Sequence, residues 1–538
     1  MSDLMTLRKF ETLSPFEIKN ELIGLAKAAT RTTQSAFLNA GRGNPNWIAT
    51  EPRDAFFLLG QFAITESRRV MDIPPGLGGM PQVSGIAVRL DAWLAQHAGM
   101  PGAHFLSALV EFAVIKFSFD RDAFVHELVD SIIGDNYPVP DRMLVHNERI
   151  VHEYLMWAMC GEPRPAGRFD LYAVEGGTAA MCYIFKSLKA NRLLFPGDTI
   201  ALGTPIFTPY LEMTHLEDYD LKVVNIAAPQ ENRFQYTDDE LKKLEDPRIK
   251  AFFVVNPGNP TGMGMNRDTI AKIVTLVKTK RPDLMLLTDD VYGTFVTDFR
   301  SLLGELPRNT IGVYSYSKYF GCTGWRLGVI AIHEDNIFDE MIAKLPDQHL
   351  MALDKRYGPI TLEPRELKFI DRIVADSRDI GLNHTAGLSL PQQVMMTMFS
   401  LYELMDEQKA YQKACMAVVN KRMDSMVDAL ELQLDPNASY DGYYALIDFE
   451  FWARRNIGDE AVDYLKKHVH PLDLAFRLAE DHGIVLLNGG GFEAPQWSMR
   501  VSLANLPDEA YENIGRGVRA IARGYRDAYE ASKAAPNS

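Results

Sequence analysis

Seven short apolar runs between residues 169 and 332 alternate with segments of helical periodicity, and this alternation constrains the possible fold more than any other feature. Runs of this length and composition are typical of buried strands, and helices between them are typical of parallel pairing with crossover connections. We therefore expect an α/β fold with a mostly parallel, seven-stranded sheet. The expected strands are Phe169–Val174, Thr199–Leu202, Leu221–Ile226, Ala251–Val255, Leu284–Leu287, Ile311–Tyr314 and Val329–Ile332.

The patterns outside this region predict further segments. A helix is expected from Ser14 to Thr30, and strands are expected at Tyr443–Phe451, Ile484–Leu487 and Met499–Leu503 among C-terminal helices. We expect a small α+β domain built from both ends of the chain. The predicted division is 1–60 (an arm and part of the small domain), 61–165 (mostly helical), 166–334 (the large-domain core), 335–388 (an inserted helical segment) and 389–538 (the C-terminal small domain).

Composition narrows the class of protein. The net charge of −15 argues against a nucleic acid or an anionic membrane as the main partner. Four cysteines without a C-x-x-C spacing fit a reduced, cytoplasmic protein and predict no metal site. Residues 1–22 have no signal-peptide core, and the apolar stretch 104–119 is interrupted by Glu111 and Lys116, so we expect a buried helix there and no membrane span.

One lysine lies between hydroxyl side chains directly after the apolar run 311–314. The stretch Ser315-Tyr316-Ser317-Lys318 is followed eight residues later by Arg326, with glycines around it. A lysine placed in this way can form a Schiff base with an aldehyde, and pyridoxal phosphate (PLP) is the usual aldehyde in such sites. Ser315, Ser317 and Arg326 would then face the cofactor phosphate. The alternative for the lysine taken alone is a surface position on a turn, but the complete spacing favours a cofactor site.

Other groups that PLP requires have candidates at the carboxyl ends of predicted strands, where open α/β sheets bind their ligands. Asp289 follows strand 284–287 and is predicted to keep the pyridine nitrogen protonated, while Tyr292 reaches the phenolic oxygen. Asn259, in the turn after strand 251–255, is a second donor to that oxygen. The alternatives are a helix cap at Asp289 and an ordinary β-turn around Asn259.

The phosphate and the ring of the cofactor have their own candidates. Gly176, Gly177 and Thr178 lie between a predicted strand and a predicted helix, so their N–H groups and the threonine hydroxyl suit a dianion. Phe207 is the candidate for stacking on the ring. A single aromatic residue such as Phe207 is more often part of a core. The Gly-Gly-Thr sequence, taken alone, is weak evidence for a phosphate site.

Together, these motifs resemble in content and order the fold-type I PLP enzymes of the aspartate aminotransferase superfamily, over roughly residues 40–503. The resemblance implies a homodimer with a shared active site, with residues 61–165 near the dimer contact. It implies that Arg500 pairs with the substrate α-carboxylate and that Tyr137 reaches the phosphate of the neighbouring subunit's cofactor. Read on its own, an arginine in an alternating strand more commonly has a surface or salt-bridge role.

The departures from an ordinary aminotransferase are similar to one group within that superfamily. Extra residues lie before Gly176 and between Ile332 and Ser389, and the turn at 39–47 carries Arg42 beside the expected substrate site. These features resemble the bifunctional aspartate 4-decarboxylase/aspartate aminotransferase group. That resemblance implies conversion of L-aspartate to L-alanine and CO2, a side activity of transamination with 2-oxo acids, and large homo-oligomers.

Several alternatives remain open at this stage. Arg42 is predicted to bind the distal substrate carboxylate, with Gly43 and Asn259 as neighbouring substrate contacts; Arg378 is its rival, and a structural surface role for Arg42 is the third possibility. A plain aminotransferase for aspartate or another amino acid shares every cofactor residue and is the alternative function. A DNA-binding regulator of the same fold would need a basic helix-turn-helix module, and neither terminus of this acidic chain supplies one.

Overall fold

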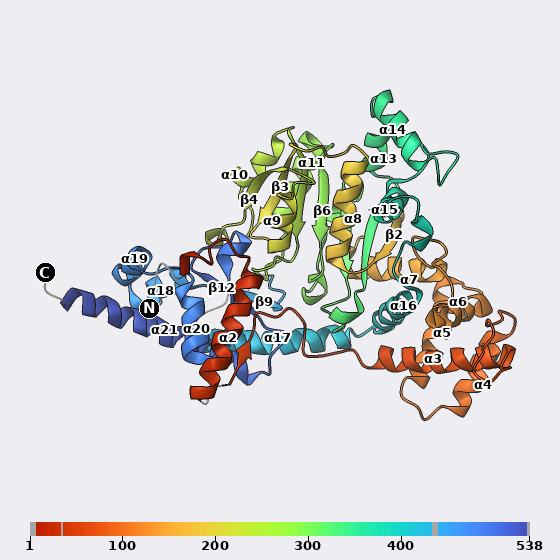
Figure 1. Ribbon diagram of the computed structural model, residues 1–538, viewed down its shortest axis with the longest axis horizontal. Coiled ribbons are helices and arrows are strands. Elements are labelled where there is room, and N and C mark those ends of the chain that lie inside the picture. Colours follow the sequence, from red (N-terminus) through yellow and green to blue (C-terminus); the bar gives the residue numbers. More distant parts are fainter. Residues whose placement is uncertain (1–6, 34–35, 433–438, 535–538) are drawn as a thin grey trace.

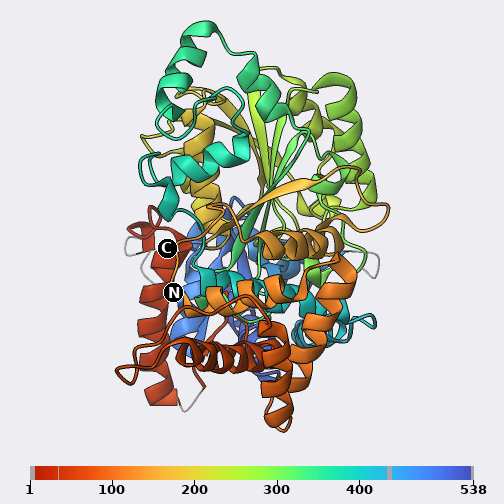
Figure 2. The same cartoon turned by 90° about the vertical axis from the view of Figure 1, so that its right-hand side faces the viewer.

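The computed structural model describes residues 7–33, 36–432 and 439–534. Three parts are visible in Figure 1: a central sheet with helices around it, a smaller unit that contains both ends of the chain, and a group of helices (α3 to α6) on the other side. Figure 2, turned by 90°, shows the strands of the central sheet stacked between layers of helices.

The central sheet has the predicted seven strands in the order β2-β8-β7-β6-β5-β3-β4. Strand β8 is antiparallel to both of its neighbours, β2 and β7, and the other neighbouring pairs are parallel. The predicted mostly parallel α/β fold is thus confirmed, with strand ends shifted by no more than two residues. The strands are β2 (Phe169–Val174), β3 (Thr199–Thr204), β4 (Lys222–Ala227), β5 (Ile249–Val255), β6 (Met285–Asp289), β7 (Thr310–Ser315) and β8 (Gly328–His333).

Helices cover both faces of this sheet because its strands are apolar on both sides. Helices α8 and α15 pack on one face, in a core that includes Phe253 and Leu287; α11 and α12 pack on the other, in a core that includes Phe252 and Leu286. Neighbouring residues of one strand thus face opposite layers, as the two-residue period of a strand requires. These helices are α8 (Gly177–Ala190), α11 (Arg267–Lys280), α12 (Leu302–Glu305) and α15 (Phe369–Ser377).

The smaller unit joins the two ends of the chain. Strand β1 pairs with β10, helix α2 packs on α20, and a three-stranded antiparallel sheet has the order β11-β12-β9. Its elements are α2 (Pro15–Thr33), β1 (Leu38–Asn39), α17 (Ala410–Ala429), β9 (Tyr444–Asp448), α18 (Phe449–Ile457), α19 (Asp459–His468), α20 (Asp473–His482), β10 (Ile484–Val485), β11 (Leu487–Asn488), β12 (Ser498–Ser502) and α21 (Glu509–Ala534).

One strand predicted in this unit is shorter than expected. Residues 449–451 begin helix α18 instead of continuing β9, because the Asp448 side chain accepts a hydrogen bond from the Phe451 N–H and caps the helix. The alternating aromatic pattern at 449–451 favoured a strand, but the N-cap determines the local structure. The end predicted for this strand at Phe451 was therefore wrong by three residues.

The helical part lies beside the antiparallel end of the sheet. Helix α16 belongs by sequence to the predicted segment 389–538, yet it packs against α3, α5, α6 and α7. This packing joins segment 61–165 to the chain that leads into the small unit. The helices are α3 (Glu51–Val70), α4 (Ile86–Gln96), α5 (Ala103–Phe117), α6 (Arg121–Ile133), α7 (Val145–Leu155), a π-helix (Met156–Cys160) and α16 (Leu390–Met405).

Short elements complete the described chain. Segment 335–388 contains α13 and α14 before α15 (Figure 1). None of the helices in the described ranges is both long and apolar enough to span a membrane. The remaining short elements are α9 (Thr208–Thr214), α10 (Asp238–Lys242), α13 (Ile337–Ala343), α14 (Asp347–Tyr357), and 3-10 turns at Gln230–Asn232, Lys243–Glu245, Gly293–Phe295, Thr323–Trp325, Asn383–Thr385 and Gly489–Phe492.

Candidate active site

A cavity of about 290 Å³ lies where β5, β6 and β7 end and the small unit meets the sheet. The carboxyl end of a parallel sheet is the usual ligand site of such folds. Strand β9 and strand β12 of the small unit close the cavity from the other side. Twelve of the residues predicted from the sequence line it: Gly43, Gly177, Thr178, Phe207, Asn259, Asp289, Tyr292, Ser315, Ser317, Lys318, Arg326 and Arg500.

Lys318 lies on the connection between β7 and β8, with its amine in the cavity. The amine donates a hydrogen bond of 2.9 Å to the Gly43 carbonyl. The Ser315 hydroxyl, 3.0 Å from that of Ser317, also bonds the Leu327 carbonyl at 3.2 Å, which ties the start of this connection to its end. The lysine therefore projects from a braced turn toward the N-terminal segment of the chain.

Asp289, the last residue of β6, is a buried carboxylate at the bottom of the cavity. The Tyr210 hydroxyl donates to it at 2.6 Å, and the Val291 N–H donates at 3.3 Å. Burial raises the pKa of Asp289, although both hydrogen bonds and the positive charge of Lys318 oppose that shift. A cationic ring nitrogen placed against this carboxylate would pair with it, so the site fits a pyridinium.

An anion cradle lies at the N-terminus of α8. Gly176 has φ of 86°, and a Cβ at this position would lie 2.5 Å from the Arg326 guanidinium, so only glycine permits this close approach. The guanidinium itself is held by the carbonyls of Thr323, at 2.9 Å, and Glu175, at 3.3 Å. A fixed cation, a helix N-terminus and the nearby serine hydroxyls together suit a phosphate group.

Aromatic rings form one wall of the cavity. Phe207 is half-buried there and meets the Tyr210 ring edge-on, with centroids 5.3 Å apart. Its other neighbour is Phe16 of α2, which reaches the cavity from the N-terminal arm, with centroids 5.7 Å apart. Phe207 is thereby held in a position from which it can cover a flat ring.

Arg500, on β12, is the most buried cation of the cavity, with 1% of its surface exposed. One terminal nitrogen donates to the Asn259 side-chain oxygen at 2.9 Å, and the other donates to the Gly41 carbonyl at 3.2 Å. Its Nε has no hydrogen-bond partner among the described residues. A buried guanidinium with an unused donor fits an anionic ligand such as a carboxylate.

Other predicted residues lie elsewhere. Gly176, the N-cap residue of α8, does not line the cavity; Arg42 is exposed beside Gly43 and also does not line it. Arg378 lies outside the cavity, where it bonds the Glu175 carboxylate at 3.1 Å and the Tyr183 hydroxyl at 3.1 Å. Tyr137 is exposed, with its ring edge-on to that of His384.

Six cavity residues were not predicted as site residues from the sequence: Phe16, Tyr210, Val255, Val291, Thr323 and Tyr444. The two tyrosines are buried and contact charged groups. Burial alone raises the pKa of Tyr444, but Lys318, Arg500 and a hydrogen bond from Tyr292 together lower it below its ordinary value. A signal for Tyr210 was present, since it follows Phe207 in the same short stretch.

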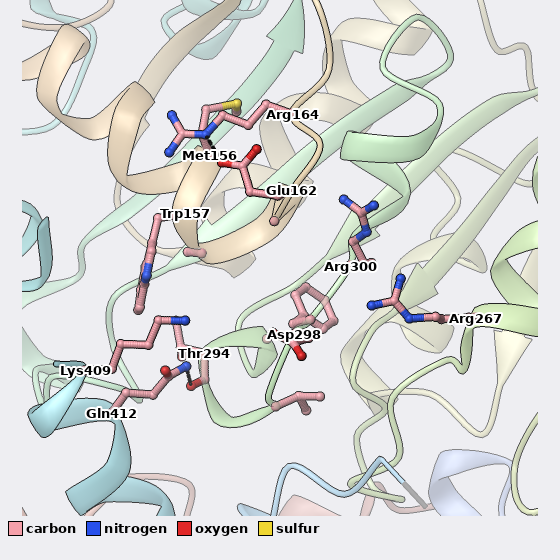
Figure 3. A pocket seen from close by; sticks show the side chains of 15 residues that line it. Met156, Trp157, Glu162, Arg164, Arg267, Thr294, Asp298, Arg300, Lys409 and Gln412 are labelled. Carbon is pink, nitrogen blue, oxygen red and sulfur yellow. Dashed lines mark hydrogen bonds and ion pairs between the residues drawn. The ribbon is translucent and has the colours of Figure 1, made fainter. Parts of the chain in front are cut away.

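Figure 3 shows a second cavity, which Gly293 and Thr294 help to line. Arg300 and Arg267 lie on one side of it, and Lys409, Trp157 and Gln412 lie on the other (Figure 3). Arg300 already bonds the Cys160 carbonyl at 2.7 Å and pairs with the Glu305 carboxylate at 3.1 Å.

Arg164, another basic residue that lines this second cavity, pairs with the Glu153 carboxylate at 2.9 Å and with that of Glu162 at 3.1 Å. Its charge is thus partly neutralised within the protein. Within the described ranges, no group of three or more His, Cys, Asp or Glu side chains could hold a metal ion. The cavity at the end of the sheet brings together the lysine amine, the buried carboxylate and the anion cradle, and it is therefore the candidate active site.

Comparison with known proteins identifies the family to which the chain is similar. The family model described as aminotransferase class I and II matches residues 174–517. A protein of a Pseudomonas species, named bifunctional aspartate aminotransferase and L-aspartate beta-decarboxylase, is 47% identical over 525 residues, which cover 97% of this chain and 98% of that protein.

More distant relatives match in part or in fold. The aspartate aminotransferase of Pyrococcus abyssi is 34% identical over 147 residues, covering 26% of this chain and 36% of that protein. The crystal structure of an aromatic aminotransferase from Pyrococcus horikoshii superposes with a TM-score of 0.55 at 16% identity, covering 93% of this chain and 100% of that one. At this identity the superposition supports the fold alone.

Proposed function

The chain belongs to the class I and II aminotransferase family, and from this premise we propose that it converts L-aspartate to L-alanine and CO2 and also transaminates aspartate with 2-oxoglutarate. The observation that carries this proposal is the 47% identity to a bifunctional enzyme of that kind, which extends over nearly the full length of both chains. The extra helices α3 to α6 and the inserted segment 335–388 are included in that match.

The proposed cofactor is PLP, which supplies an electron-withdrawing ring when bonded to the substrate nitrogen. Three observations support it: the buried carboxylate of Asp289, the lysine amine that projects into the same cavity, and the anion cradle beside Arg326. Each group of the cofactor then has a partner. The proposed contacts are Lys318 for the aldehyde, Asp289 for the ring nitrogen, Asn259 and Tyr292 for the phenolic oxygen, Phe207 for the ring face, and Gly176, Gly177, Thr178, Ser315, Ser317 and Arg326 for the phosphate.

The substrate is proposed to enter with its α-carboxylate on Arg500, whose Nε donor is unused by the described residues. The Asn259 side chain and the Gly41 carbonyl hold the guanidinium in a fixed direction, so little ordering is needed when the carboxylate binds. Lys318 lies in the same cavity and is the base that takes the proton from Cα and returns a proton afterwards.

The partner of the distal carboxylate remains a proposal with two candidates. Arg42 adjoins Gly43, which lines the cavity, but its side chain is exposed. Arg378 is engaged with Glu175, so it would have to exchange one carboxylate for another. We favour Arg42, because its exposed side chain can move to a ligand, whereas Arg378 must first break its ion pair with Glu175. Either cation must loosen its hold as CO2 leaves, since a tight pair would oppose decarboxylation.

A homodimer with a shared site, and a larger assembly of dimers, is also proposed. The segment from α3 to α4 exposes large apolar side chains, which monomeric proteins rarely leave in one region. The exposed fractions are Phe57 58%, Ile64 45%, Ile73 84%, Leu77 51%, Met80 52% and Val88 68%. Tyr137, also exposed, is the proposed contact to the neighbouring subunit's cofactor. Light scattering after size-exclusion chromatography measures the assembly, and a monomer would contradict this proposal.

Product analysis tests the function. The PLP-loaded protein is mixed with L-aspartate alone, and then with 2-oxoglutarate added, and the products are followed by NMR. We expect alanine and CO2 in equal amounts without any keto acid. Turnover that requires 2-oxoglutarate, with oxaloacetate and glutamate as products, would instead identify a plain aspartate aminotransferase, which is the alternative function.

A further inference from the structure

Tyr444 occupies a central place in the cavity although no part of the proposed function uses it. It is the first residue of β9, is 2% exposed, and lines the cavity together with Lys318 and Arg500. The Arg500 guanidinium lies 4.2 Å from the centre of its ring. The side chain therefore lies between the proposed α-carboxylate site and the reactive lysine.

The hydroxyl of Tyr444 faces the amine of Lys318. A Cβ atom placed on Gly43 would lie 2.9 Å from the hydroxyl and 3.0 Å from the amine, so both groups point at the same small space. The Gly43 carbonyl accepts a hydrogen bond from Lys318 at 2.9 Å and one from the Tyr443 hydroxyl at 2.7 Å. The absence of a side chain at position 43 leaves the tyrosine and the lysine open to each other.

Among the neighbouring tyrosines, Tyr444 is the one whose surroundings favour loss of the hydroxyl proton. Tyr292 donates to the Tyr444 oxygen, and burial raises the pKa of Tyr292 well above its ordinary value, so Tyr292 keeps its proton. The charged groups that face Tyr444 are the cations Lys318 and Arg500 and the more weakly acting carboxyl of Asp441. The two cations favour the phenolate form, and the carboxyl opposes it.

We propose that Tyr444 is the proton-exchange partner of Lys318, an inference that rests on the proposed function because it assigns Lys318 as the base. When the amine takes a proton from the substrate Cα, the electron pair of that C–H bond stays with the substrate and the amine becomes an ammonium ion. The ammonium passes one proton to the Tyr444 phenolate, which restores the neutral amine and leaves a phenol. The phenol returns the proton in the reverse step, so protons and charge balance over the cycle.

The test compares Tyr444→Phe with the wild-type protein, both loaded with PLP. Hydrogen exchange at Cα is followed by NMR in D2O, with L-aspartate and with L-alanine, so it is measured whether or not CO2 is released. We expect exchange at Cα to slow at least about 10-fold, because one positioned acid–base group contributes about 10²–10⁴-fold. The midpoint of the pH-dependent absorbance change of the loaded protein, without substrate, should also fall by about one pH unit, because a group that stabilises the positive charge is lost.

Binding separates a proton-exchange role from a merely structural one. An aspartate with a methyl group in place of its Cα hydrogen binds but cannot lose that proton, and its dissociation constant should be the same for Y444F and the wild type. Tyr236→Phe removes the hydroxyl of another buried tyrosine, one outside the cavity, and should change none of these measurements. Exchange within twofold of the wild type, or an equal loss of binding and exchange, would overturn the proposal.

A second measurement does not depend on how well the phenylalanine variant folds. Incorporation of 3-fluorotyrosine at position 444 preserves the shape of the side chain and makes its hydroxyl a stronger acid. The pH profile of Cα exchange should then move to lower pH by about one unit, and an unmoved profile would equally overturn the proposal. If aspartate yields no CO2 while exchange responds as expected, the decarboxylase function fails and the role of Tyr444 stands.

Discussion

Replacing Tyr210 by phenylalanine should weaken cofactor binding. The Tyr210 hydroxyl donates a 2.6 Å hydrogen bond to the buried Asp289, and the other hydrogen bond given to this carboxylate, from the Val291 N–H, is longer at 3.3 Å. Burial raises the pKa of Asp289 and the tyrosine opposes that shift, so the variant should raise this pKa further. A larger fraction of the empty protein would then hold a neutral Asp289, which cannot pair with a protonated ring nitrogen.

The expected magnitude follows from the kind of bond that is lost. A hydrogen bond to an ionised group contributes about 1.5–3 kcal/mol. At 1.4 kcal/mol for each tenfold change, the dissociation constant of PLP should rise about 10- to 150-fold. The loss should be largest at low pH and should shrink as pH rises, because at high pH Asp289 is ionised with or without the tyrosine.

Equilibrium dialysis of the apoprotein against PLP between pH 6 and 9 measures this effect. Tyr236→Phe is the matched control, since Tyr236 is also buried but does not line the cavity. A dissociation constant for Y210F within threefold of the wild type at pH 6 would refute the reasoning. So would an equal loss of affinity in Y210F and Y236F, which would indicate a general effect of the lost hydroxyl.

Three further predictions concern other parts of the chain. Gly43→Ala places a Cβ 3.0 Å from the Lys318 amine and should displace that amine, which should lower kcat about 10- to 100-fold with little change in the midpoint of thermal unfolding. An unchanged kcat would show that the open space beside the Lys318 amine is not needed. Arg42→Ala should raise the KM for aspartate at least about 10-fold, with Arg378→Ala as the comparison; the reverse ranking would assign the distal carboxylate to Arg378. Burial raises the pKa of Glu403 to about 8, above its ordinary value of 4.5, because the folded protein favours the protonated side chain. Below pH 4.5 the side chain is protonated in both the folded and the unfolded state, and the folded protein becomes less stable as pH rises from 4.5 toward 8. At pH 8 the free energy of unfolding of Glu403→Gln should therefore exceed that of the wild type by up to about 4 kcal/mol, and the variant should unfold at a higher temperature. The same pH dependence of unfolding in both proteins would contradict this.

The large sheet could be predicted from sequence because its strands are short, apolar on both faces and separated by periodic helices. The small unit was harder, since its strands are only two to five residues long and one of them leads directly into α18. A single capping side chain, Asp448, decides where that strand ends, and the aromatic residues after it favour a strand when read without the cap.

Most of the residues that line the cavity at the end of the sheet could also be predicted from the sequence, because they follow strand ends that the sequence marks clearly. Tyr210 and Tyr444 were not, since a tyrosine within an apolar segment has the same pattern as a core residue. Their roles come from contacts with Asp289, Lys318 and Arg500, which are distant in the sequence; Tyr210 and Asp289, for example, are 79 positions apart. Such contacts depend on how the two units pack, and local periodicity carries no information about that packing.

The hydrogen bond between Arg500 and the Gly41 carbonyl spans 459 positions of the chain, and it has a consequence for biosynthesis. A chain that is still on the ribosome acquires its lysine and its anion cradle when β8 is complete, long before β12 has been translated. The Arg500 guanidinium, which is the proposed substrate contact, arrives near the end of synthesis and is fully oriented only when it meets both Asn259 and the N-terminal turn. Under the proposed function, a chain translated only as far as β8 would therefore hold the lysine and the anion cradle without the guanidinium that selects an amino acid, and substrate recognition would be a property of the finished chain alone.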